Sequence, residues 1–245
     1  MFKKNKLLAF IGARAGSKGL KNKNTIDFNG KPLIHWTINA SLNSTYIDRT
    51  LVSTENSKIA EIAKLSGADV PFLRPPQLSQ DDSRIEDAIR HCLHWLKSCE
   101  NTFYDYIILL QPTSPLRTAQ HIDQAIDHYF QHKKTSQDIL VSVTRAPQKM
   151  GWLMKEINPL YITCCFNEAK TLAQRQKLKH YYLPNGAIYI APVKFIIKSG
   201  FYAKKTLSFL MKEEDSVDID TPQDLDHALK IFYQKTITNN NNSLL

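Results

Sequence analysis

Short apolar segments alternate with amphipathic ones along much of this chain, and this alternation constrains the fold more than any other feature of the sequence. The apolar runs are typical of buried strands, whereas the segments between them repeat their apolar residues every three or four positions, as helices do. The expected strands cover residues 6–11, 49–53, 106–110 and 139–143, with helices at 32–40, 59–67, 85–96 and 122–130. Such units predict an α/β fold with a largely parallel sheet covered on both faces, and ligands beyond the carboxyl ends of its strands.

The alternation breaks at residues 146–184, where polar, aromatic and basic residues are mixed without a clear period. We interpret this segment as an excursion from the main sheet that could serve as a dimerisation element. Residues 187–191 return to the sheet as a strand, and a last helix is expected after Thr221, its N-cap. A single domain therefore covers residues 1–238, and the asparagine-rich residues 239–245 are expected to form a disordered tail.

The charge balance favours an anionic partner. The chain of 245 residues has 32 lysines and arginines against 23 aspartates and glutamates, a formal net charge of +9. Charge alone does not separate a nucleic acid from a phosphorylated metabolite. However, the sequence has neither a basic helix nor an alternation of aromatic and basic residues, which argues against nucleic acid as a partner.

Two further observations concern the compartment. The early apolar run, residues 7–11, is too short for a signal segment or a membrane span. The cysteines at positions 92, 99, 164 and 165 match no usual zinc or redox spacing, so we interpret them as reduced thiols. We therefore expect a cytoplasmic protein with no membrane partner.

The loop expected after the first strand has the composition of a phosphate-binding segment. Residues 12–24 contain three of the eight glycines, four cationic residues and no acid. Glycines let backbone N–H groups approach anionic oxygens, and cationic side chains add charge-assisted hydrogen bonds. Neither the P-loop pattern nor the dinucleotide-binding pattern is present, so those enzyme classes lose support. The alternative is a solvated basic loop, but its place directly after the first strand favours the phosphate interpretation.

Near the other end of the chain, Asp218 and Asp220 are separated by one residue. In an extended segment, carboxylates with this spacing point to the same face and could hold a hard divalent cation. Magnesium typically takes one or two carboxylates together with phosphate oxygens and water, which suits a chain with a phosphate-binding loop. The alternative is that both residues only precede and cap the helix at Thr221, and the spacing alone leaves both interpretations open.

Six sequence motifs occur together in an order typical of one enzyme family. They are residues 13–24 (ARAGSKGLKNKN), 73–75 (LRP), 109–117 (LLQPTSPLR), 175–176 (RQ), 184–189 (PNGAIY) and 218–220 (DID). With these motifs the chain resembles the CMP-sialic acid synthetases, or acylneuraminate cytidylyltransferases, and their relatives acting on other nonulosonic acids. The resemblance covers nearly the whole chain, and its first motif is highly specific.

The resemblance implies a three-layer, Rossmann-like nucleotidyltransferase fold with a small dimerisation excursion. The implied activity is transfer of CMP from CTP to the C2 hydroxyl of a sialic-acid-like, nine-carbon 2-keto acid, with release of pyrophosphate. Lys23 would act in catalysis by neutralising charge that builds up on the phosphates. The residues implied to hold the nucleotide are Arg14, Ser17, Lys18 and Lys23 at the triphosphate, and Asn24 and Arg74 near the nucleoside.

Further residues are implied to contact the acceptor and a metal. Gln111, Tyr189 and Arg175 would meet the acceptor sugar, with Arg175 reaching in from the partner subunit of a homodimer. Asp218 and Asp220 would bind Mg²⁺, and one of them would assist in removing the hydroxyl proton. Positioning and charge neutralisation are the two demands of this class of transfer.

Two departures from the family pattern fall on the side expected to bind the acid. Many relatives place a second arginine just before the Pro-Asn-Gly motif, where this chain has Leu183. Many also carry paired serines after the Arg-Pro motif, where this chain has the Ser-Arg-Ile sequence at residues 83–85. His180 or Lys179 could replace the missing cation, although surface solvation explains both residues equally well. A legionaminate-like or pseudaminate-like acceptor therefore stays open.

Other functions remain as alternatives. A cytidylyltransferase for an eight-carbon acid such as Kdo is disfavoured, because the first motif of that family differs from residues 17–19 and 23–24 here. A non-catalytic nucleotide sensor is disfavoured by the retention of Lys23, Asp218 and Asp220. A nucleic-acid binder would need the basic helix or the aromatic and basic alternation that the sequence lacks.

Overall fold

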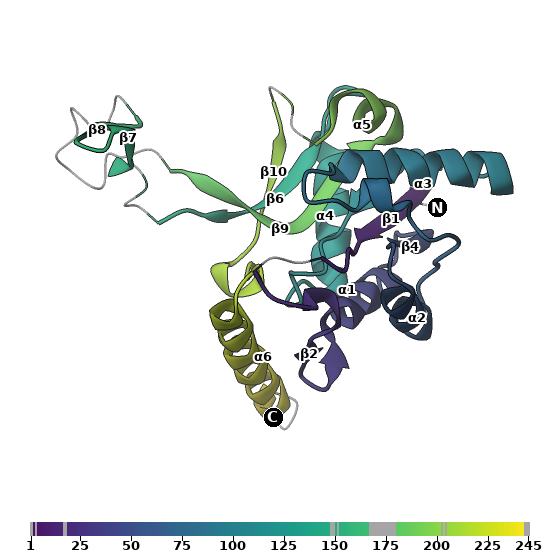
Figure 1. Cartoon of the computed structure of the whole chain (residues 1–245), viewed down its shortest axis with the longest axis horizontal. Helices are drawn as coiled ribbons and strands as arrows, with labels where there is room; N and C mark the ends of the chain where they lie inside the picture. Colours follow the sequence, from purple (N-terminus) through teal and green to yellow (C-terminus); the bar gives the residue numbers. More distant parts are fainter. Residues whose placement is uncertain are drawn as a thin grey trace.

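The structure, a computed structural model, describes residues 2, 4–16, 19–147, 150, 152–166, 180–201, 203 and 205–242. Its centre is a six-stranded sheet (Figure 1). In sheet order the strands are β10 (Leu207–Leu210), β6 (Leu140–Arg145), β9 (Tyr182–Pro192), β5 (Tyr106–Leu109), β1 (Leu7–Gly12) and β4 (Arg49–Ser53). Neighbouring strands are parallel except around β9, which runs antiparallel to both β5 and β6. The predicted α/β fold with a mostly parallel sheet is confirmed.

Helices cover both faces of this sheet. One face carries α1 (Leu33–Leu42), α2 (Ser57–Leu65) and α4 (Ala119–His132), and the other carries α3 (Ile85–Glu100) and α5 (Val193–Ser199). Strand β1 shows the two-sided burial, because Leu7, Ala9 and Ile11 pack into the first layer of side chains. Leu8 and Phe10 pack into the second layer. A strand buried on both faces is continuously apolar, as the sequence of β1 is.

Strand β9 differs most from its sequence-based expectation. The predicted strand at residues 187–191 forms only the inner part of β9, which begins at Tyr182. The chain reaches β9 from an excursion beyond the carboxyl end of β6, so it runs back along β6 in the opposite direction. The first residues of β9 therefore lie at the end of the sheet where its neighbours finish. Neither α5 nor β10 was predicted from the sequence.

The predicted excursion contains a separate two-stranded hairpin. It is formed by β7 (Met154–Asn158) and β8 (Tyr161–Cys164), which pair antiparallel and stand well apart from the main sheet in Figure 1. The two ends of the excursion are joined where the N–H of Ala146 donates to the carbonyl of Tyr181 at 2.9 Å. Residues 167–179 lie outside the described part of the chain.

The carboxyl-terminal helix α6 (Pro222–Asn242) packs on the first part of the chain. A short hairpin, β2 (Asp27–Phe28) with β3 (Lys31–Pro32), precedes α1 and contributes Phe28 to a third apolar cluster. Phe28, Trp36 and Phe232 meet edge to face there, and Ile219 is buried in the same cluster. Short 3₁₀ helices in the described part of the chain include η1 (Lys23–Thr25), η2 (Pro76–Leu78) and η6 (Glu213–Asp215).

The start of α6 has the expected cap. The Asp224 N–H donates to the Thr221 hydroxyl at 3.2 Å, and the Asp224 carboxylate accepts from the Thr221 N–H at 2.8 Å. The helix continues to Asn242, so it includes the first residues of the segment expected as a tail. All four cysteines are free. In the described part of the chain, no helix has the length and apolar character that crossing a membrane requires.

Candidate active site

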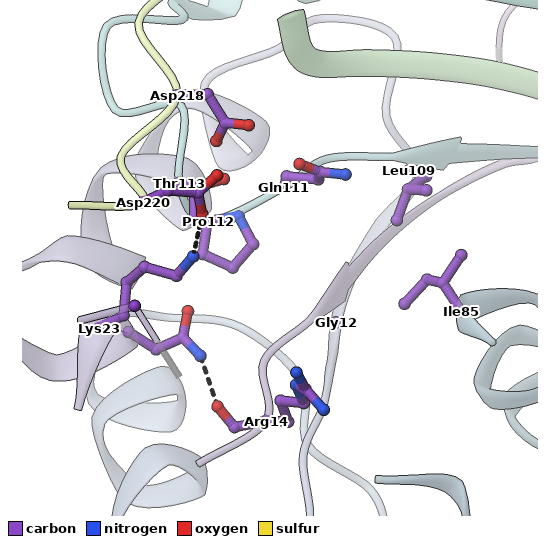
Figure 2. A pocket seen from close by; sticks show the side chains of 12 residues that line it. Gly12, Arg14, Lys23, Ile85, Leu109, Gln111, Pro112, Thr113, Asp218 and Asp220 are labelled. Atoms are coloured by element: carbon purple, nitrogen blue, oxygen red, sulfur yellow. Dashed lines mark hydrogen bonds and ion pairs between the residues drawn. The ribbon is translucent and has the colours of Figure 1, made fainter. Parts of the chain in front are cut away.

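A pocket of about 460 Å³ opens beyond the carboxyl ends of β1 and β5. The loops that follow these strands both reach it, as the strand order predicted. The residues that line it are Gly12, Arg14, Gly19, Lys23, Asn24, Ile85, Leu109, Gln111, Pro112, Thr113, Asp218 and Asp220 (Figure 2). Most of the residues proposed for nucleotide, acceptor and metal therefore lie around one cavity.

The cationic loop and the twin-aspartate segment meet in this pocket. Lys23 Nζ lies 2.6 Å from Asp220 Oδ1, an ion pair drawn as a dashed line in Figure 2. The backbone of the two segments is equally close, because a Cβ added to Gly19 would lie 2.5 Å from the carbonyl oxygen of Asp220. Only glycine allows that approach without a shift of the backbone. Segments from the two ends of the chain thus form one wall.

Asp218 offers a carboxylate oxygen for which the described part of the chain provides no partner. Its Oδ1 is buried and accepts no hydrogen bond from any residue that the structure describes. Burial raises the pKa of the Asp218 carboxyl, and the nearby Asp220 carboxylate raises it further, while a hydrogen bond with the Thr113 side chain opposes both effects. The segment is held in place where the Ile219 N–H donates to the Thr113 carbonyl at 2.8 Å.

The donor set at the two aspartates fits magnesium. A buried carboxylate oxygen without a partner costs free energy that a cation would recover. Among the described residues, no group of three or more histidine, cysteine, aspartate and glutamate side chains could hold a metal ion by itself. A site with two carboxylates suits Mg²⁺, which completes its coordination with phosphate oxygens and water.

Gln111 and Asp218 approach each other over Gly186. Gly186 has a φ of +73°, and a Cβ added to it would lie 2.7 Å from Gln111 Oε1 and 3.3 Å from Asp218 Oδ2. The left-handed backbone conformation therefore favours glycine at this point of the Pro-Asn-Gly motif, and a side chain there would displace the Gln111 amide. The residue proposed for the acceptor and the residue proposed for the metal therefore both lie beside this turn.

A smaller pocket of about 280 Å³ adjoins the first and shares Gly12, Arg14 and Ile85 with it. Arg74 lines this second pocket, and its place near the nucleoside stays a prediction. The Arg14 guanidinium points toward its rim, where it lies 2.9 Å from Asp81 Oδ1. The Asn24 side chain donates to the Arg14 carbonyl at 2.8 Å, and this hydrogen bond joins the two ends of the cationic loop.

Sequence reasoning missed Glu55, which lies in the loop after β4 and forms hydrogen bonds with the cationic loop and with Arg74. Glu55 accepts a hydrogen bond from the Ala15 N–H at 2.6 Å and another from Arg74 Nη2 at 3.1 Å. Burial alone would raise the pKa of the Glu55 carboxyl, but these hydrogen bonds and the Arg74 charge hold it below its ordinary value. Glu55 belongs to none of the six motifs, so no pattern in the sequence indicated this contact.

Arg117 was also missed, although its motif was identified. The side chain is fully buried beneath the pocket, and Nη1 donates to the Gln111 carbonyl at 3.2 Å and to the Ala187 carbonyl at 2.8 Å. Burial lowers the pKa of its guanidinium. Arg117 therefore ties the loop after β5 to β9. Its place at the end of the LLQPTSPLR motif was the available signal.

Some expected site residues are not among those that line the pocket. Tyr189 is buried on β9, where its ring packs 5.5 Å from that of Phe201, so its contact with the acceptor stays a prediction. Ser17, Lys18 and Arg175 lie outside the described residues. Of the two departures from the family pattern, Ile85 lines both pockets and Leu183 is exposed near the start of β9.

Comparison with protein families identifies one match. A family model described as "Cytidylyltransferase" matches residues 8–244. The chain is 34% identical over 233 residues to an N-acylneuraminate cytidylyltransferase of Escherichia coli O18:K1:H7, covering 95% of this chain and 53% of that protein. The chain therefore spans about half the length of this relative.

Other curated relatives are matched over most of their length. A CMP-N,N'-diacetyllegionaminic acid synthase of Legionella pneumophila is 37% identical, with 89% of this chain and 93% of that protein covered. A pseudaminic acid cytidylyltransferase of Campylobacter jejuni is 34% identical, with 94% of this chain and 97% of that protein covered. The three relatives differ in the acid that their names give.

Solved structures share the fold at low sequence identity. A CMP:2-keto-3-deoxy-manno-octonic acid synthetase in complex with CTP superposes with a TM-score of 0.70 at 15% identity, covering 94% of this chain and 99% of that one. A 4-diphosphocytidyl-2C-methyl-D-erythritol synthase from Anaerococcus prevotii superposes with a TM-score of 0.63 at 12% identity, covering 94% and 99%. The expected Rossmann-like nucleotidyltransferase fold is confirmed.

Proposed function

The chain belongs to the cytidylyltransferase family, and from this premise we propose that it transfers CMP from CTP to the C2 hydroxyl of a nonulosonic acid. The hydroxyl oxygen forms a bond to the α-phosphorus, the bond from that phosphorus to the bridging oxygen breaks, and pyrophosphate leaves. The observation that carries the proposal is the meeting of Lys23 with Asp220 beside Gln111 in one pocket. The names of the relatives at 34–37% identity support an acid of the neuraminate, legionaminate or pseudaminate type.

The ion pair of Lys23 and Asp220 suggests how the pocket accepts a triphosphate. In the structure each charge of the pair neutralises the other at 2.6 Å. We propose that binding of CTP breaks this ion pair. Lys23 would then contact the phosphates together with Arg14, Ser17 and Lys18, and the Asp220 carboxylate would be available to bind a cation. Cations that neutralise the α-phosphate and the departing pyrophosphate are what this transfer needs.

Asp218 and Asp220 are the residues that would hold Mg²⁺. When bound there, Mg²⁺ would supply positive charge to the phosphates of CTP. The unpartnered Oδ1 of Asp218 supports this assignment. Either carboxylate could accept the proton that the acceptor hydroxyl loses.

The test of the activity is release of pyrophosphate from CTP and Mg²⁺ with each of four acids: N-acetylneuraminate, a legionaminate, a pseudaminate and the eight-carbon acid Kdo. We expect release with at least one nine-carbon acid and none with Kdo. Absence of release with every nine-carbon acid, from protein that binds CTP, would contradict the proposed function.

Lys23→Met tests the phosphate role, with Lys21→Met as the matched control. Lys21 is exposed in the same loop and does not line the pocket. A charge-assisted hydrogen bond contributes about 1.5–3 kcal/mol, so we expect Lys23→Met to raise KM for CTP about 10-fold to 100-fold. Equal kinetics for the two variants would rule out a phosphate role for Lys23.

Asp220→Asn tests the metal assignment, with Asp226→Asn as the control. Asp226 is exposed on α6 and outside the pocket. We expect Asp220→Asn to abolish turnover and to weaken the binding of Mn²⁺ to the protein and CTP complex, measured by calorimetry without acceptor. Asp226→Asn should keep both properties. Full activity of Asp220→Asn would remove the metal assignment.

We also propose that the protein is a homodimer through the β7–β8 hairpin. Apolar side chains that would normally be buried are exposed on this hairpin, including Ile157, Leu160, Tyr161 and Ile162. A second copy of the chain is the proposed cover, and it would bring Arg175 toward the neighbouring pocket. The expected compartment is the cytoplasm, where the four cysteines would stay reduced.

Leu160→Glu tests the dimer, and Leu65→Glu is its control. The two leucines are similarly exposed, 86% and 82%, but Leu65 lies on α2, away from the hairpin. Sedimentation equilibrium should show a dimer for the unmodified protein and for Leu65→Glu, and a monomer for Leu160→Glu. A monomeric unmodified protein would contradict the proposal.

A further inference from the structure

The Asn185 side chain joins three parts of the molecule beneath the pocket. It is only 3% exposed, and both ends of its amide are used. Asn185 Oδ1 accepts from the Ser142 hydroxyl at 2.6 Å and from the Ala187 N–H at 3.2 Å. Asn185 Nδ2 donates to the Ser216 hydroxyl at 2.9 Å. Ser142 belongs to β6, whereas Ser216 precedes the twin-aspartate segment.

The direction of every hydrogen bond in this chain of contacts is fixed. The Ile188 N–H donates to Ser142 Oγ at 2.7 Å, so the Ser142 hydroxyl proton is free to go to Asn185. Ser216 in turn donates its own proton to the Lys212 carbonyl at 2.7 Å and accepts from Asn185. A chain with one consistent direction has no competing arrangement of its protons. It connects the sheet firmly to the loop before Asp218.

An irregularity in the sheet makes this connection possible. The pairing of β6 with β9 shifts register between Val141 and Val143, so Ser142 has no partner residue on β9. The Ser142 side chain is thereby available to Ile188 and Asn185. Bulges of this kind redirect a side chain next to a functional site.

Asn185 is connected to the pocket by one hydrogen bond and by its place in the chain, although it is not among the residues that line the pocket. The hydrogen-bond partner Ser216 lies two residues before Asp218, and Asp218 lines the pocket. The next residue, Gly186, is the turn over which Gln111 Oε1 and Asp218 Oδ2 approach each other. A shift of Asn185 would therefore move Asp218 and Gln111 relative to each other.

We propose that Asn185 is a positioning residue for the transfer: it fixes the loop that carries Asp218 to the sheet and sets the spacing of Asp218 from Gln111. This inference rests on the proposed function, since it assigns Asn185 a part in that same site. The hydrogen bond to Ser216 is the link through which the position of Asp218 depends on Asn185. An error of about 1 Å in such a position can cost on the order of 100-fold in rate.

Ser216→Ala tests the proposal without emptying a buried site. It removes the hydroxyl that accepts from Asn185, whereas Ser216→Thr keeps a hydroxyl there. The control is Ser44→Ala, because Ser44 Oγ also donates one hydrogen bond, to Asp123, and accepts one, from the Tyr46 N–H. Ser44 lies before β4, at the end of the sheet opposite the pocket.

We expect Ser216→Ala to lower kcat about 10-fold and to weaken Mn²⁺ binding to the CTP complex about 10-fold, with KM for CTP within about 2-fold. The binding measurement is made by calorimetry without acceptor. Ser216→Thr should stay within about 2-fold of the unmodified protein in both quantities. Ser44→Ala should lower Tm about as much as Ser216→Ala and leave kcat and Mn²⁺ binding unchanged.

The possible results distinguish failure of the positioning role of Asn185 from failure of the proposed CMP transfer. If Ser216→Ala lowers Tm but keeps kcat and Mn²⁺ binding, Asn185 has only a structural role and the inference is wrong. The same holds if Ser44→Ala reproduces the kinetic loss. Failure of the proposed function looks different, because the unmodified protein itself would then release no pyrophosphate with any nine-carbon acid.

Discussion

Gly186 and Gly30 have nearly the same left-handed backbone conformation, with φ of +73° and +76°, but different surroundings. Apart from its chain neighbours, no described residue has an atom within 4 Å of a Cβ added to Gly30, whereas a Cβ added to Gly186 meets Gln111 and Asp218. An alanine pays about 1–2 kcal/mol for this conformation alone. We expect Gly30→Ala to lower the free energy of unfolding by about that amount with unchanged kinetics.

Gly186→Ala should carry the same conformational cost and displace Gln111 as well. Urea unfolding should show a loss at least as large as that of Gly30→Ala, and KM for the acceptor acid should rise about 10-fold or more. Comparison of the two variants isolates the steric effect from the backbone effect. If both variants bound the acceptor equally well, the turn at Gly186 would not determine the position of Gln111.

At the scale of single residues, the sequence predicted those site residues whose motif indicates a chemical role. Lys23, Asp218 and Asp220 were named from their spacing and family pattern, and the structure brings them into one pocket. Glu55 could not be named in this way. Its contacts with Ala15 and Arg74 exist only because β4 lies beside β1 and ends at the same edge of the sheet. Such contacts depend on tertiary arrangement, which no local pattern contains.

His121 gives α4 a cap that depends on pH. Thr118 and His121 form a reciprocal capping box, in which His121 Nδ1 accepts from the Thr118 N–H at 3.2 Å. Burial lowers the pKa of His121 below its ordinary 6.5, although the Asp215 carboxylate opposes this effect. The folded protein therefore favours the neutral ring, and protonation would remove the acceptor.

The sign of the pH effect follows from this shift. Between the folded pKa and 6.5 the unfolded chain binds a proton that the folded chain does not, so the contribution of His121 is present above pH 6.5 and is lost as pH falls through that window. His121→Gln, which keeps a capping acceptor, should make Tm fall less steeply between pH 6.5 and about pH 5. Identical Tm profiles would contradict the role of His121, because His35, His91 and His128 stay in both proteins.

The docking of α6 depends on its aromatic contacts. The Phe232 ring lies 4.9 Å from that of Trp36 and 5.6 Å from that of Phe28, whereas the neighbouring Tyr233 is 52% exposed. We expect Phe232→Ala to lower the free energy of unfolding by about 2 kcal/mol, less than a fully buried phenylalanine would cost. Tyr233→Ala should lower it by about 0.5 kcal/mol or less in the same urea titration. Equal losses would mean that α6 is not held by this cluster.

Among the elements, helices with a clear apolar period and strands with a dense apolar run were predicted close to their observed bounds. The strand at 49–53 matches β4, and the helix starting at Ile85 matches α3. The direction of β9 was not predictable, because a strand buried on both faces has the same apolar pattern in either direction. Its partners on both sides determine its direction, and they lie far away in the sequence.

At the scale of the whole molecule, segments near the two ends of the chain line one pocket. If CTP and Mg²⁺ bind between the loop after β1 and the segment before α6, amide hydrogen exchange should slow in both stretches together. Ligand at about 100 times its Kd should also raise the free energy of unfolding by about 2.7 kcal/mol. Protection confined to residues 19–25, with no change at 216–220, would mean that the aspartates do not take part in binding the nucleotide.

The excursion is closed at its base, and this closure lets the sequences of the excursion and of the main sheet vary independently. Arg145 pairs with Tyr182 in the sheet, and the Ala146 and Tyr181 backbones are joined directly after it, so the segment between them leaves and returns at a single point. Doubling the length of such an insertion costs only about 0.6 kcal/mol in loop-closure entropy. A segment exchanged between relatives at this junction would therefore leave the body of the enzyme folded. Because the junction lies at the pocket end of β6, an exchanged segment would change what approaches the mouth of the pocket and leave the central sheet as it is.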